Sequence, residues 1–457
     1  MTSPANTRLP ISDDVEAVLP AAISRAHDWL KSTADEEDKA TEQLADLLRD
    51  DDGVKFTMDF VDRVMRPEDD KVAAHALKDI SSHYDPSFLG SINGALVGAG
   101  GFFGPILPNL VMPVARLYMR KMVGHLVLDA ESDALNKILD KAAESGEQLN
   151  LNLLGEAVLG EEEAKSRAQR TLKLIQNPRV TYVSVKASSM VAQLNHWDID
   201  GSVERLKERL RPLYQAAADR TDKVFINMDM EEYHDLHLTI RLFKELLSEP
   251  EFLTLDAGIV LQAYLPDTFD ALKDVADFAK ERVAKGGGKV KVRIVKGANL
   301  SMETVQGEVH DWPLATYTNK LDVDANYYRL LDFILREEYA DSVRIGVATH
   351  NLYTAAMAYE LGKKRGVLHM MDSEMLQGMS PAQQAAVRKV FDGRQILYTP
   401  VVHAEDFDVA VSYLVRRLEE NSAPQNFLYA LFAPGEEPLA DQEETFRRAV
   451  AKRWDTF

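Results

Sequence analysis

The nine residues Val290-Lys291-Val292-Arg293-Ile294-Val295-Lys296-Gly297-Ala298 carry a strong strand signal. Four of the first six are β-branched, which favours extended backbone, and the small pair Gly297-Ala298 ends the run. Helical sequence precedes the run at 268–284 and follows it at 325–336. A strand between two helices predicts one unit of a parallel sheet.

This alternation continues in both directions, from residue 149 to residue 398. The expected strands are 149–153, 182–185, 224–228, 259–262, 290–294, 343–348, 368–371 and 396–398. The expected helices between them are 203–217, 234–247, 268–284, 325–336, 353–365 and 381–391. Such alternation over roughly 280 residues predicts an α/β fold, the (β/α)8 barrel. A doubly wound sheet is the alternative, but no GxGxxG follows the first strand.

Polar residues stand at the ends of most of these strands. The carboxyl ends of barrel strands meet at one mouth, where such side chains converge on a ligand. One such residue alone is equally typical of a loop, but their recurrence predicts a functional site. They are Lys186, Asp229, Gln262, Arg293, Lys296, His350, Asn351, Glu374 and Tyr398.

Three positions that follow the expected strands suggest specific chemistry. Lys186 suits a Schiff-base lysine, a cation for a carboxylate, or a solvated loop residue. The small step Gly297-Ala298 would let backbone amides approach a pyrophosphate. His350-Asn351 opens a helix, whose N-terminus favours phosphate, although His350 there is as typical of a cap or a packing residue.

A second polar group lies downstream, in the expected helix that begins near residue 405. Tyr413, Arg416, Arg417 and Glu420 stand at i, i+3, i+4 and i+7, and therefore share one helix face. Two guanidiniums can grip a carboxylate through paired, charge-assisted hydrogen bonds. The pattern suits a small zwitterion such as an amino acid, and the alternative is a solvated face with an ordinary ion pair.

Composition excludes several classes of function. The chain has 457 residues and carries 53 Lys and Arg against 73 Asp and Glu, so its net charge of −20 disfavours a nucleic-acid partner. It contains no cysteine, which excludes disulfides, thiolate metal sites and a cysteine nucleophile. No HExxH or EF-hand pattern occurs, and the His234/His237 pair belongs to an amphipathic helix, so we expect no metal site.

Residues 86–115 contain no charged side chain. Their length would span a bilayer, but repeated Gly and Pro would leave backbone groups unsatisfied in lipid. We expect an apolar loop packed on protein, with a peripheral membrane or partner contact as the alternative. The N-terminus has no early apolar run typical of a signal peptide, so we expect a cytoplasmic protein.

Further motifs occur in a characteristic order. Together with the strand-end residues and the Arg pair, they resemble the proline dehydrogenase domain of the bifunctional enzyme proline utilization A, from about residue 149 to residue 427. The motifs are LLGEA at Leu153–Ala157, VSVKASS at Val183–Ser189, NMDMEE at Asn227–Glu232, LQAY at Leu261–Tyr264, YTNK at Tyr317–Lys320 and MLQGM at Met375–Met379.

The resemblance implies FAD-dependent oxidation of L-proline to Δ1-pyrroline-5-carboxylate, with electrons passed to a quinone. It implies catalytic roles for Arg293, Lys186 and Asp229. The substrate residues that it implies are Lys186, Tyr398, Tyr413, Arg416, Arg417 and Leu376. The cofactor residues that it implies are Asp229, Gln262, Arg293, Val295, Lys296, Gly297, Ala298, Thr318, Lys320, His350, Asn351, Glu374 and Glu420.

The resemblance also implies a division of the chain. We expect an N-terminal helical arm at 1–147, the barrel at 148–430 and, at 431–457, a linker toward an aldehyde dehydrogenase domain. That second activity needs a catalytic cysteine, so it would lie elsewhere in the full-length chain or in a partner protein. The sequence departs from the family pattern at Asn152, where an Asp is usual, and at Asn299-Leu300, where an aromatic pair is usual.

Three other functions remain open at this point. One is another flavin-barrel oxidoreductase such as methylenetetrahydrofolate reductase. The second is a class I aldolase that uses Lys186 or Lys296. The third is a non-catalytic interaction module that binds through residues 86–115. An FAD absorption spectrum separates the flavoenzymes from the other two.

Overall fold

The structure is a computed structural model. It describes residues 13–33, 51–65, 67, 69–84, 101, 104–109, 111–115, 127–130, 132–155, 158, 160–403, 410, 413, 417, 420, 423–433 and 435–455. Arg416 and most of the helix expected from about residue 405 fall outside these ranges.

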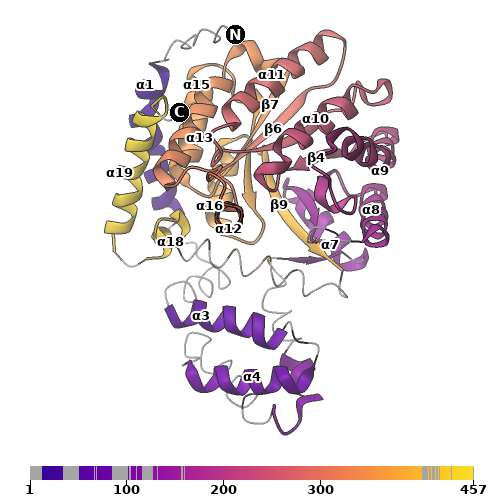
Figure 1. The fold of residues 1–457 in the computed structure, drawn as a ribbon. Helices are drawn as coiled ribbons and strands as arrows, with labels where there is room; N and C mark the ends of the chain where they lie inside the picture. Colours follow the sequence, from indigo (N-terminus) through magenta and orange to yellow (C-terminus); the bar gives the residue numbers. More distant parts are fainter. Residues whose placement is uncertain are drawn as a thin grey trace.

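Eight parallel strands close into a barrel at the centre of the fold (Figure 1). Each strand pairs with the next, and β9 pairs with both β8 and β2, which closes the ring. A short strand, β1 (Leu128–Asp129), also pairs with the end of β9. The barrel strands are β2 (Gln148–Leu153), β3 (Tyr182–Lys186), β4 (Phe225–Asp229), β5 (Ala257–Gln262), β6 (Val290–Val295), β7 (Val343–Ala348), β8 (Met371–Leu376) and β9 (Gln395–Val402). The predicted (β/α)8 barrel is confirmed.

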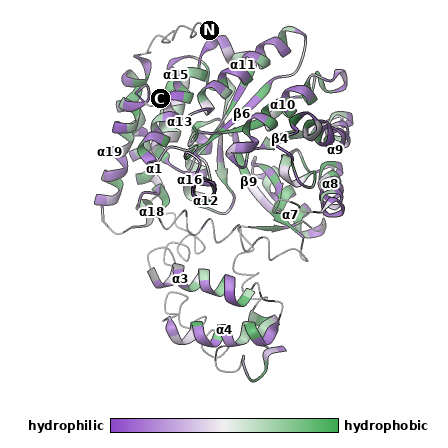
Figure 2. Cartoon of the chain, in the orientation of Figure 1, coloured by the Kyte–Doolittle hydropathy of each residue, from purple (hydrophilic) through white to green (hydrophobic). Residues whose placement is uncertain are grey.

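Helices surround the barrel, and several of them bury an apolar stripe against it. On α9 the buried residues Val203, Leu206, Leu210, Leu213 and Ala217 recur every three or four positions, as a helix packed on a sheet requires. Hydrophilic and hydrophobic residues alternate along these outer helices (Figure 2). The helices are α7 (Ser132–Glu144), α8 (Glu161–Gln176), α9 (Ile199–Asp219), α10 (Leu236–Leu247), α11 (Thr268–Ala284), α12 (Leu300–His310), α13 (Lys320–Ile334), α14 (Glu337–Ala340), α15 (Leu352–Lys364) and α16 (Pro381–Val390).

The seventh barrel strand lies later in the chain than the sequence predicts. The expected strand at 368–371 is wrong, because residues 368–370 form the short 3-10 helix η6 and β8 begins at Met371. Asp372 and Glu374 in β8 are 3% and 2% exposed, and both form ion pairs inside the barrel. The sequence prediction relied on apolar residues, and it missed this strand because two of its inward-facing side chains are charged.

The first and last described helices both pack on the barrel. Helix α1 (Asp14–Thr33) lies against α15, and α19 (Glu437–Lys452) lies against α13 (Figure 1). Val15, Val18 and Trp29 of α1 belong to the same apolar core as the barrel residues. Helix α1 is therefore part of the barrel's outer layer.

A buried ion network links these helices. Asp332 on α13 is fully buried, and its carboxylate lies 2.6 Å from Arg365 and 3.0 Å from Arg453. Arg365 also pairs with Asp14 at 3.1 Å, and Arg453 pairs with Glu16 at 2.6 Å. One carboxylate thus connects α13 through two guanidiniums to the start of α1.

A small helical unit forms a second apolar core. It contains α3 (Asp51–Phe60), the π-helical turn η1 (Val61–Met65) and α4 (Asp70–His83), packed around residues such as Phe60 and Leu77. Val61 belongs to a third apolar cluster, which also contains Val402 at the end of β9. Of the uncharged stretch 86–115, the structure describes 101, 104–109 and 111–115. Among all described residues, none of the helices has the length and apolar character to cross a membrane.

Candidate active site

The strand register brings the predicted residues to one end of the barrel. Lys186 pairs with Asp229, Gln262 with Val295, and Leu376 with Tyr398. All are the last residues of their strands except Tyr398, because β9 continues to Val402 and does not end at 398 as the sequence predicts. In barrels of this type the carboxyl ends of the strands form the active site.

Asp229 is the centre of a hydrogen-bond network at this mouth. Its Oδ1 atom accepts from Ser184 Oγ at 2.9 Å, Asn227 Nδ2 at 2.9 Å and Arg293 Nη2 at 2.7 Å. Its Oδ2 atom accepts from Tyr398 Oη at 3.0 Å. Burial and the Asp229 carboxylate raise the pKa of Tyr398, so the phenol keeps its proton and remains a donor. Four neighbours therefore fix this carboxylate in place.

Arg293 is a fixed buried cation. Burial alone would lower its pKa, but the carboxylates of Asp229 and Glu374 outweigh burial and raise it. Its Nη1 atom lies 3.8 Å from Glu374, and its guanidinium lies 4.9 Å from the centre of the Tyr398 ring. Nη1 has no hydrogen-bond partner among the described residues. The guanidinium therefore retains a donor for a further group.

Lys186 forms an ion pair across the mouth. Its Nζ atom lies 2.8 Å from Glu231, which also accepts a hydrogen bond from Ser188. Gln262 donates through Nε2 to the backbone oxygen of Glu231 at 3.0 Å, while its buried Oε1 atom has no partner among the described residues. Glu231 therefore holds both predicted residues, although the sequence analysis did not single it out.

Two lysines share one carboxylate beyond the end of β6. Lys296 lies 2.5 Å from Asp324, and Lys320 also pairs with Asp324. Burial, reinforced by the charge of Lys296, lowers the pKa of Lys320 to about 8. Two ammonium groups against one carboxylate leave an excess of positive charge, which suits an anionic group such as a phosphate.

The Gly297-Ala298 step begins directly after this strand. Gly297 has φ +128°, and a Cβ atom there would lie 2.4 Å from the Tyr264 ring. Only glycine therefore fits this position without a shift of the ring. Thr318 is exposed in the loop directly before α13. The Tyr264 ring thus explains why a glycine stands here, and the approach of a pyrophosphate to this backbone stays a prediction.

His350 and Asn351 connect β7 to α15. Nε2 of His350 accepts from the backbone N–H of Leu376 at 2.9 Å, which requires a neutral ring. Burial, and secondarily the charge of Arg417, lower the pKa of His350 to about 4. Asn351 caps α15, since its Oδ1 accepts from Tyr353 N at 3.0 Å and Thr354 N at 3.2 Å. The capping interpretation therefore accounts for Asn351.

The downstream arginine lies over the same mouth. Arg417 Nη1 lies 2.6 Å from Glu420, and the guanidinium lies 5.3 Å from the centre of the Tyr413 ring. Its buried Nε atom has no partner among the described residues. Burial lowers the pKa of Arg417, but the Glu420 carboxylate and, after it, the phenols of Tyr413 and Tyr398 outweigh burial and raise it. The predicted face is therefore formed by three of its four residues, and Arg416 lies outside the described residues.

Charged residues also fill the barrel below the mouth. Lys291 pairs with Glu374 at 2.6 Å and with Asp372 at 3.0 Å, and Arg344 pairs with Asp372 at 2.7 Å. Lys291 stands two positions before Arg293, and Asp372 two before Glu374, so each pair shares the inward face of its strand. This period of two was the signal that could have found Lys291 and Asp372.

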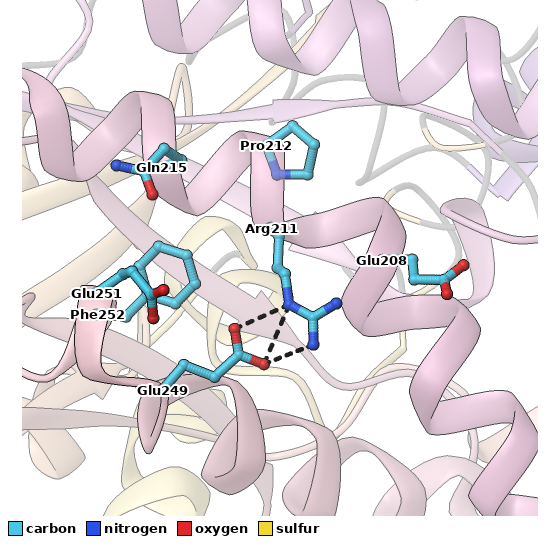
Figure 3. A pocket seen from close by; sticks show the side chains of 7 residues that line it. All are labelled: Glu208, Arg211, Pro212, Gln215, Glu249, Glu251 and Phe252. Carbon is cyan, nitrogen blue, oxygen red and sulfur yellow. Dashed lines mark hydrogen bonds and ion pairs between the residues drawn. The ribbon is translucent and has the colours of Figure 1, made fainter.

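A surface cavity lies away from these residues. It has a volume of about 330 Å³ and lies between α9 and the turn at 249–252 (Figure 3). Arg211 and Glu249 form a paired ion contact there, with Nη2 2.8 Å from Oε1. It contains none of the strand-end residues. We therefore place the candidate active site at the barrel mouth and not in this cavity.

A comparison with known families identifies the family of this chain. A family model described as proline dehydrogenase matches residues 134–430. The chain belongs to the proline dehydrogenase family. The matched range covers the whole barrel and the Tyr413–Glu420 face. The resemblance found in the sequence is thereby confirmed.

Solved structures give the same result. The chain is 48% identical to proline utilization A from Corynebacterium freiburgense, with a TM-score of 0.73 over 98% of this chain and 36% of that one. It is 26% identical to proline utilization A from Bdellovibrio bacteriovorus inactivated by N-propargylglycine, with a TM-score of 0.76 over 94% of this chain and 44% of that one. The chain thus spans less than half the length of these two relatives. A comparison with curated proteins gives no match.

Proposed function

We propose that this chain is an FAD-dependent dehydrogenase that oxidises L-proline to Δ1-pyrroline-5-carboxylate. The observation that supports it most directly is the Asp229 network, in which a buried arginine, a phenol and two further donors converge on one carboxylate. This network lies at the mouth of a barrel that belongs to the proline dehydrogenase family. The fixed charges would orient substrate and cofactor, which is the usual contribution of a protein to cofactor chemistry.

The residues at the mouth fit FAD in two ways. Within the described part of the chain, Lys296 and Lys320 pair with one carboxylate, Asp324, so their excess charge suits the pyrophosphate. Gly297 has no Cβ atom of its own, so a pyrophosphate would approach its backbone on the side away from the Tyr264 ring. When bound, FAD would supply the acceptor for the hydride that leaves proline. The remaining proposed cofactor contacts are Asp229, Gln262, Arg293, Val295, Ala298, Thr318, His350, Asn351, Glu374 and Glu420.

Arg293 would set the electrostatics of that site. Its positive charge is buried and its Nη1 donor has no described partner, so it can stabilise negative charge on a neighbouring group. Asp229 holds the guanidinium by a 2.7 Å hydrogen bond, and Tyr398 lies under it. Arg293, Lys186 and Asp229 are therefore the proposed catalytic residues.

Arg417 would bind the carboxylate of proline, together with Arg416 and Lys186. The 2.6 Å contact with Glu420 holds the guanidinium in one orientation, and its Nε donor has no described partner. Tyr398, Tyr413 and Leu376 would pack against the pyrrolidine ring. Hydride would leave C5 while the ring nitrogen loses its proton, so proline loses two electrons and two protons to form an imine.

The later steps would need other components. Electrons would pass to a quinone at a membrane surface, through a peripheral contact of a cytoplasmic protein. The product would be oxidised by an aldehyde dehydrogenase domain, either in the full-length chain or in a partner protein. The chain has no cysteine for that second step, so we expect no NADH when NAD and proline are added to it alone.

An anaerobic titration tests the main proposal. The purified, flavin-loaded chain should lose its absorption near ~450 nm when L-proline is added. It should form one pyrroline-5-carboxylate per flavin reduced, measured with o-aminobenzaldehyde. A chain that cannot be reconstituted with FAD, or whose flavin stays oxidised with proline, contradicts the proposal. Covalent trapping of substrate on Lys186 by borohydride would favour a class I aldolase instead.

A further inference from the structure

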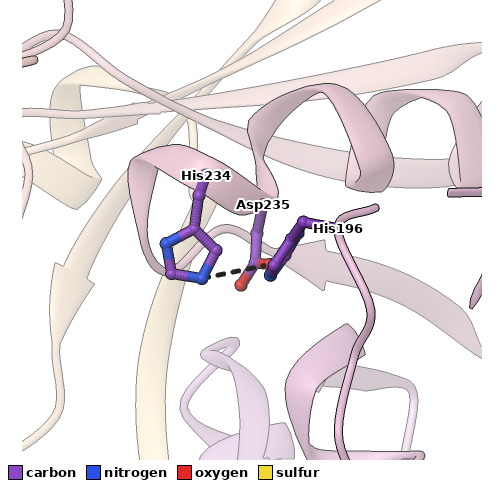
Figure 4. A group of neighbouring side chains, drawn as sticks. All are labelled: His196, His234 and Asp235. Carbon is purple, nitrogen blue, oxygen red and sulfur yellow. Dashed lines mark ion pairs between the residues drawn. The ribbon is translucent and has the colours of Figure 1, made fainter. Parts of the chain in front are cut away.

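Two histidines and an aspartate converge beside the barrel mouth. His196 lies in the loop after β3, and His234 and Asp235 lie in the 3-10 turn η4 (Tyr233–Asp235) after β4. Nε2 of His196 is 3.5 Å from Oδ1 of Asp235, and Nε2 of His234 is 3.6 Å from the same oxygen (Figure 4). All three candidate ligand atoms lie within 4.8 Å of one another.

These spacings match a tetrahedral metal site. Ligands that each lie about 2.0–2.2 Å from a Zn²⁺ ion are roughly 3.4 Å from one another. The two distances to Asp235 are close to that value, so small side-chain movements would suffice. The imidazole rings are 4.4 Å apart and nearly perpendicular, at 78°. Two nitrogens can then point to one centre without the rings stacking.

Asp235 supplies the second, independent observation. The residue is 6% exposed, and its Oδ1 atom has no hydrogen-bond partner among the described residues. A buried carboxylate oxygen without a partner is costly, and a bound cation removes that cost. This oxygen, which accepts no hydrogen bond from a described residue, is the atom that both imidazoles face.

Glu232 completes the arrangement behind His234. Its Oε2 atom lies 3.3 Å from Nδ1 of His234, the nitrogen that points away from Asp235. Metal-bound histidines commonly donate their other ring nitrogen to a carboxylate, which fixes the ring and leaves Nε2 free as a ligand. The spacing in sequence gave no sign of this, because His196 lies 38 positions before His234.

We propose that His196, His234 and Asp235 form a binding site for a divalent transition metal of the Zn²⁺ class. Three protein ligands with a nitrogen and oxygen donor set suit this ion, and water fills the fourth position. The side chains of His196 and His234 are 35% and 45% exposed, so the ion enters from solvent. The site is distinct from the Asp229 network and from the proposed flavin chemistry.

The metal would join two loops that carry residues of the active-site mouth. Lys186 lies ten positions before His196, and Glu231 lies three before His234, so the ion closes a second link beside the Lys186–Glu231 pair. A ligand that binds only the folded state raises its stability. At a hundredfold excess over Kd, Zn²⁺ should raise the Tm of this chain by about 3 °C.

Zinc binding to the flavin-loaded chain tests the proposal. After treatment with a chelator, the protein should bind one Zn²⁺ per chain in competition with a chromophoric indicator. H196Q or H234Q should each weaken binding at least tenfold, and E232Q by about 10–100-fold. H237Q is the matched control, because His237 is exposed on α10 three positions after His234 and has no part in the cluster. It should keep wild-type affinity and the same Tm shift.

An anomalous difference map at the zinc edge provides a measurement that needs no variant. It should show one peak between the two imidazoles and the Asp235 carboxylate at micromolar zinc. Equal Zn²⁺ affinity of the wild-type and H196Q/H234Q proteins would overturn the proposal. So would a peak elsewhere, an equal loss in H237Q, or an ion seen at crystal concentration only.

Discussion

The Nη2 atom of Arg293 on β6 lies 2.7 Å from Oδ1 of Asp229 on β4, and neither residue is more than 6% exposed. Strand β5 lies between them in the sheet, so the pair spans the inside of the barrel. Removing one partner of a buried ion pair leaves an unpaired charge, which is strongly destabilising. The same pair would hold the cation beside the proposed flavin.

Arg293→Met should therefore change both stability and flavin. We expect a loss of about 3–5 kcal/mol in the free energy of unfolding, because the Asp229 carboxylate stays buried without its cation. The flavin reduction potential should fall and FAD retention should weaken. Chemical denaturation and a spectroelectrochemical titration measure the two effects.

Arg344→Met is the control for that substitution. Its partner Asp372 keeps Lys291 at 3.0 Å, so no carboxylate is left unpaired. Arg344→Met should lower the free energy of unfolding by less than Arg293→Met does, and it should leave the flavin reduction potential unchanged. If Arg293→Met keeps its native potential and a full complement of FAD, Arg293 acts only in the barrel core.

Arg417→Met should weaken proline binding. Each hydrogen bond to a charged group contributes about 1.5–3 kcal/mol, so we expect the KM for proline to rise at least roughly tenfold. FAD content should barely change. Steady-state kinetics with proline and with pyrrolidine, which lacks the carboxylate, separate the effects, because only proline should be affected.

Arg447→Met is the matched control for Arg417. Arg447 forms a 2.6 Å helical ion pair with Glu443 on α19, away from the mouth. If it raises the KM as much as Arg417→Met does, the Arg417 effect is not specific to the substrate carboxylate. An unchanged KM in Arg417→Met would refute its assignment.

Gly297→Ala should damage the mouth through a steric contact. The added Cβ would lie 2.4 Å from the Tyr264 ring, and φ at this residue is +128°. Gly286→Ala is a control with similar backbone strain, since its φ is +79° and no atom lies within 4 Å of an added Cβ. Bound FAD per chain should fall in Gly297→Ala only. Equal flavin content in both variants would mean that this loop tolerates a side chain.

His350 should make the fold sensitive to acid. Its folded-state pKa of about 4 lies below the usual 6.5. As pH falls from 6.5 to 4, the unfolded chain binds a proton that the folded chain does not. The free energy of unfolding should then fall by up to about 3 kcal/mol, with no contribution from His350 above pH 6.5.

His350→Gln tests this acid dependence. The variant keeps an acceptor near the Leu376 N–H and should lose that part of the acid slope in denaturation curves measured from pH 7 to pH 4. His369→Gln, at an exposed position on η6, should retain the wild-type slope. Parallel curves for the wild type and His350→Gln would show that the buried imidazole is not responsible.

The sequence predicted the strands and helices whose pattern of apolar residues matches the side chains that are buried in the fold. The strand at 343–348 and the helix at 268–284 have the predicted bounds, because apolar strands and amphipathic helices reveal their burial directly. Strand β8 was misplaced because Asp372 and Glu374 face a charged interior that only the closed barrel creates.

The same distinction applies to the candidate site. Asp229, Arg293 and Tyr398 were predicted because parallel strands place their carboxyl ends together. The carboxylates that pair with the predicted lysines were harder to find, because no strand end in the sequence points to them. Glu231 and Asp324 lie after strand ends or inside a helix, and only tertiary contacts show that they hold Lys186 and Lys296.

The network around Asp332 has a consequence for biosynthesis. Glu16 and Arg453 are 437 positions apart, which corresponds to roughly 20–90 s of synthesis on a ribosome. Helix α1 packs on α15, so its apolar residues Val15, Val18 and Trp29 stay uncovered until residue 364 has been made. During most of its translation, the nascent chain therefore exposes the apolar face of the α1 segment. We expect chaperones to bind this segment.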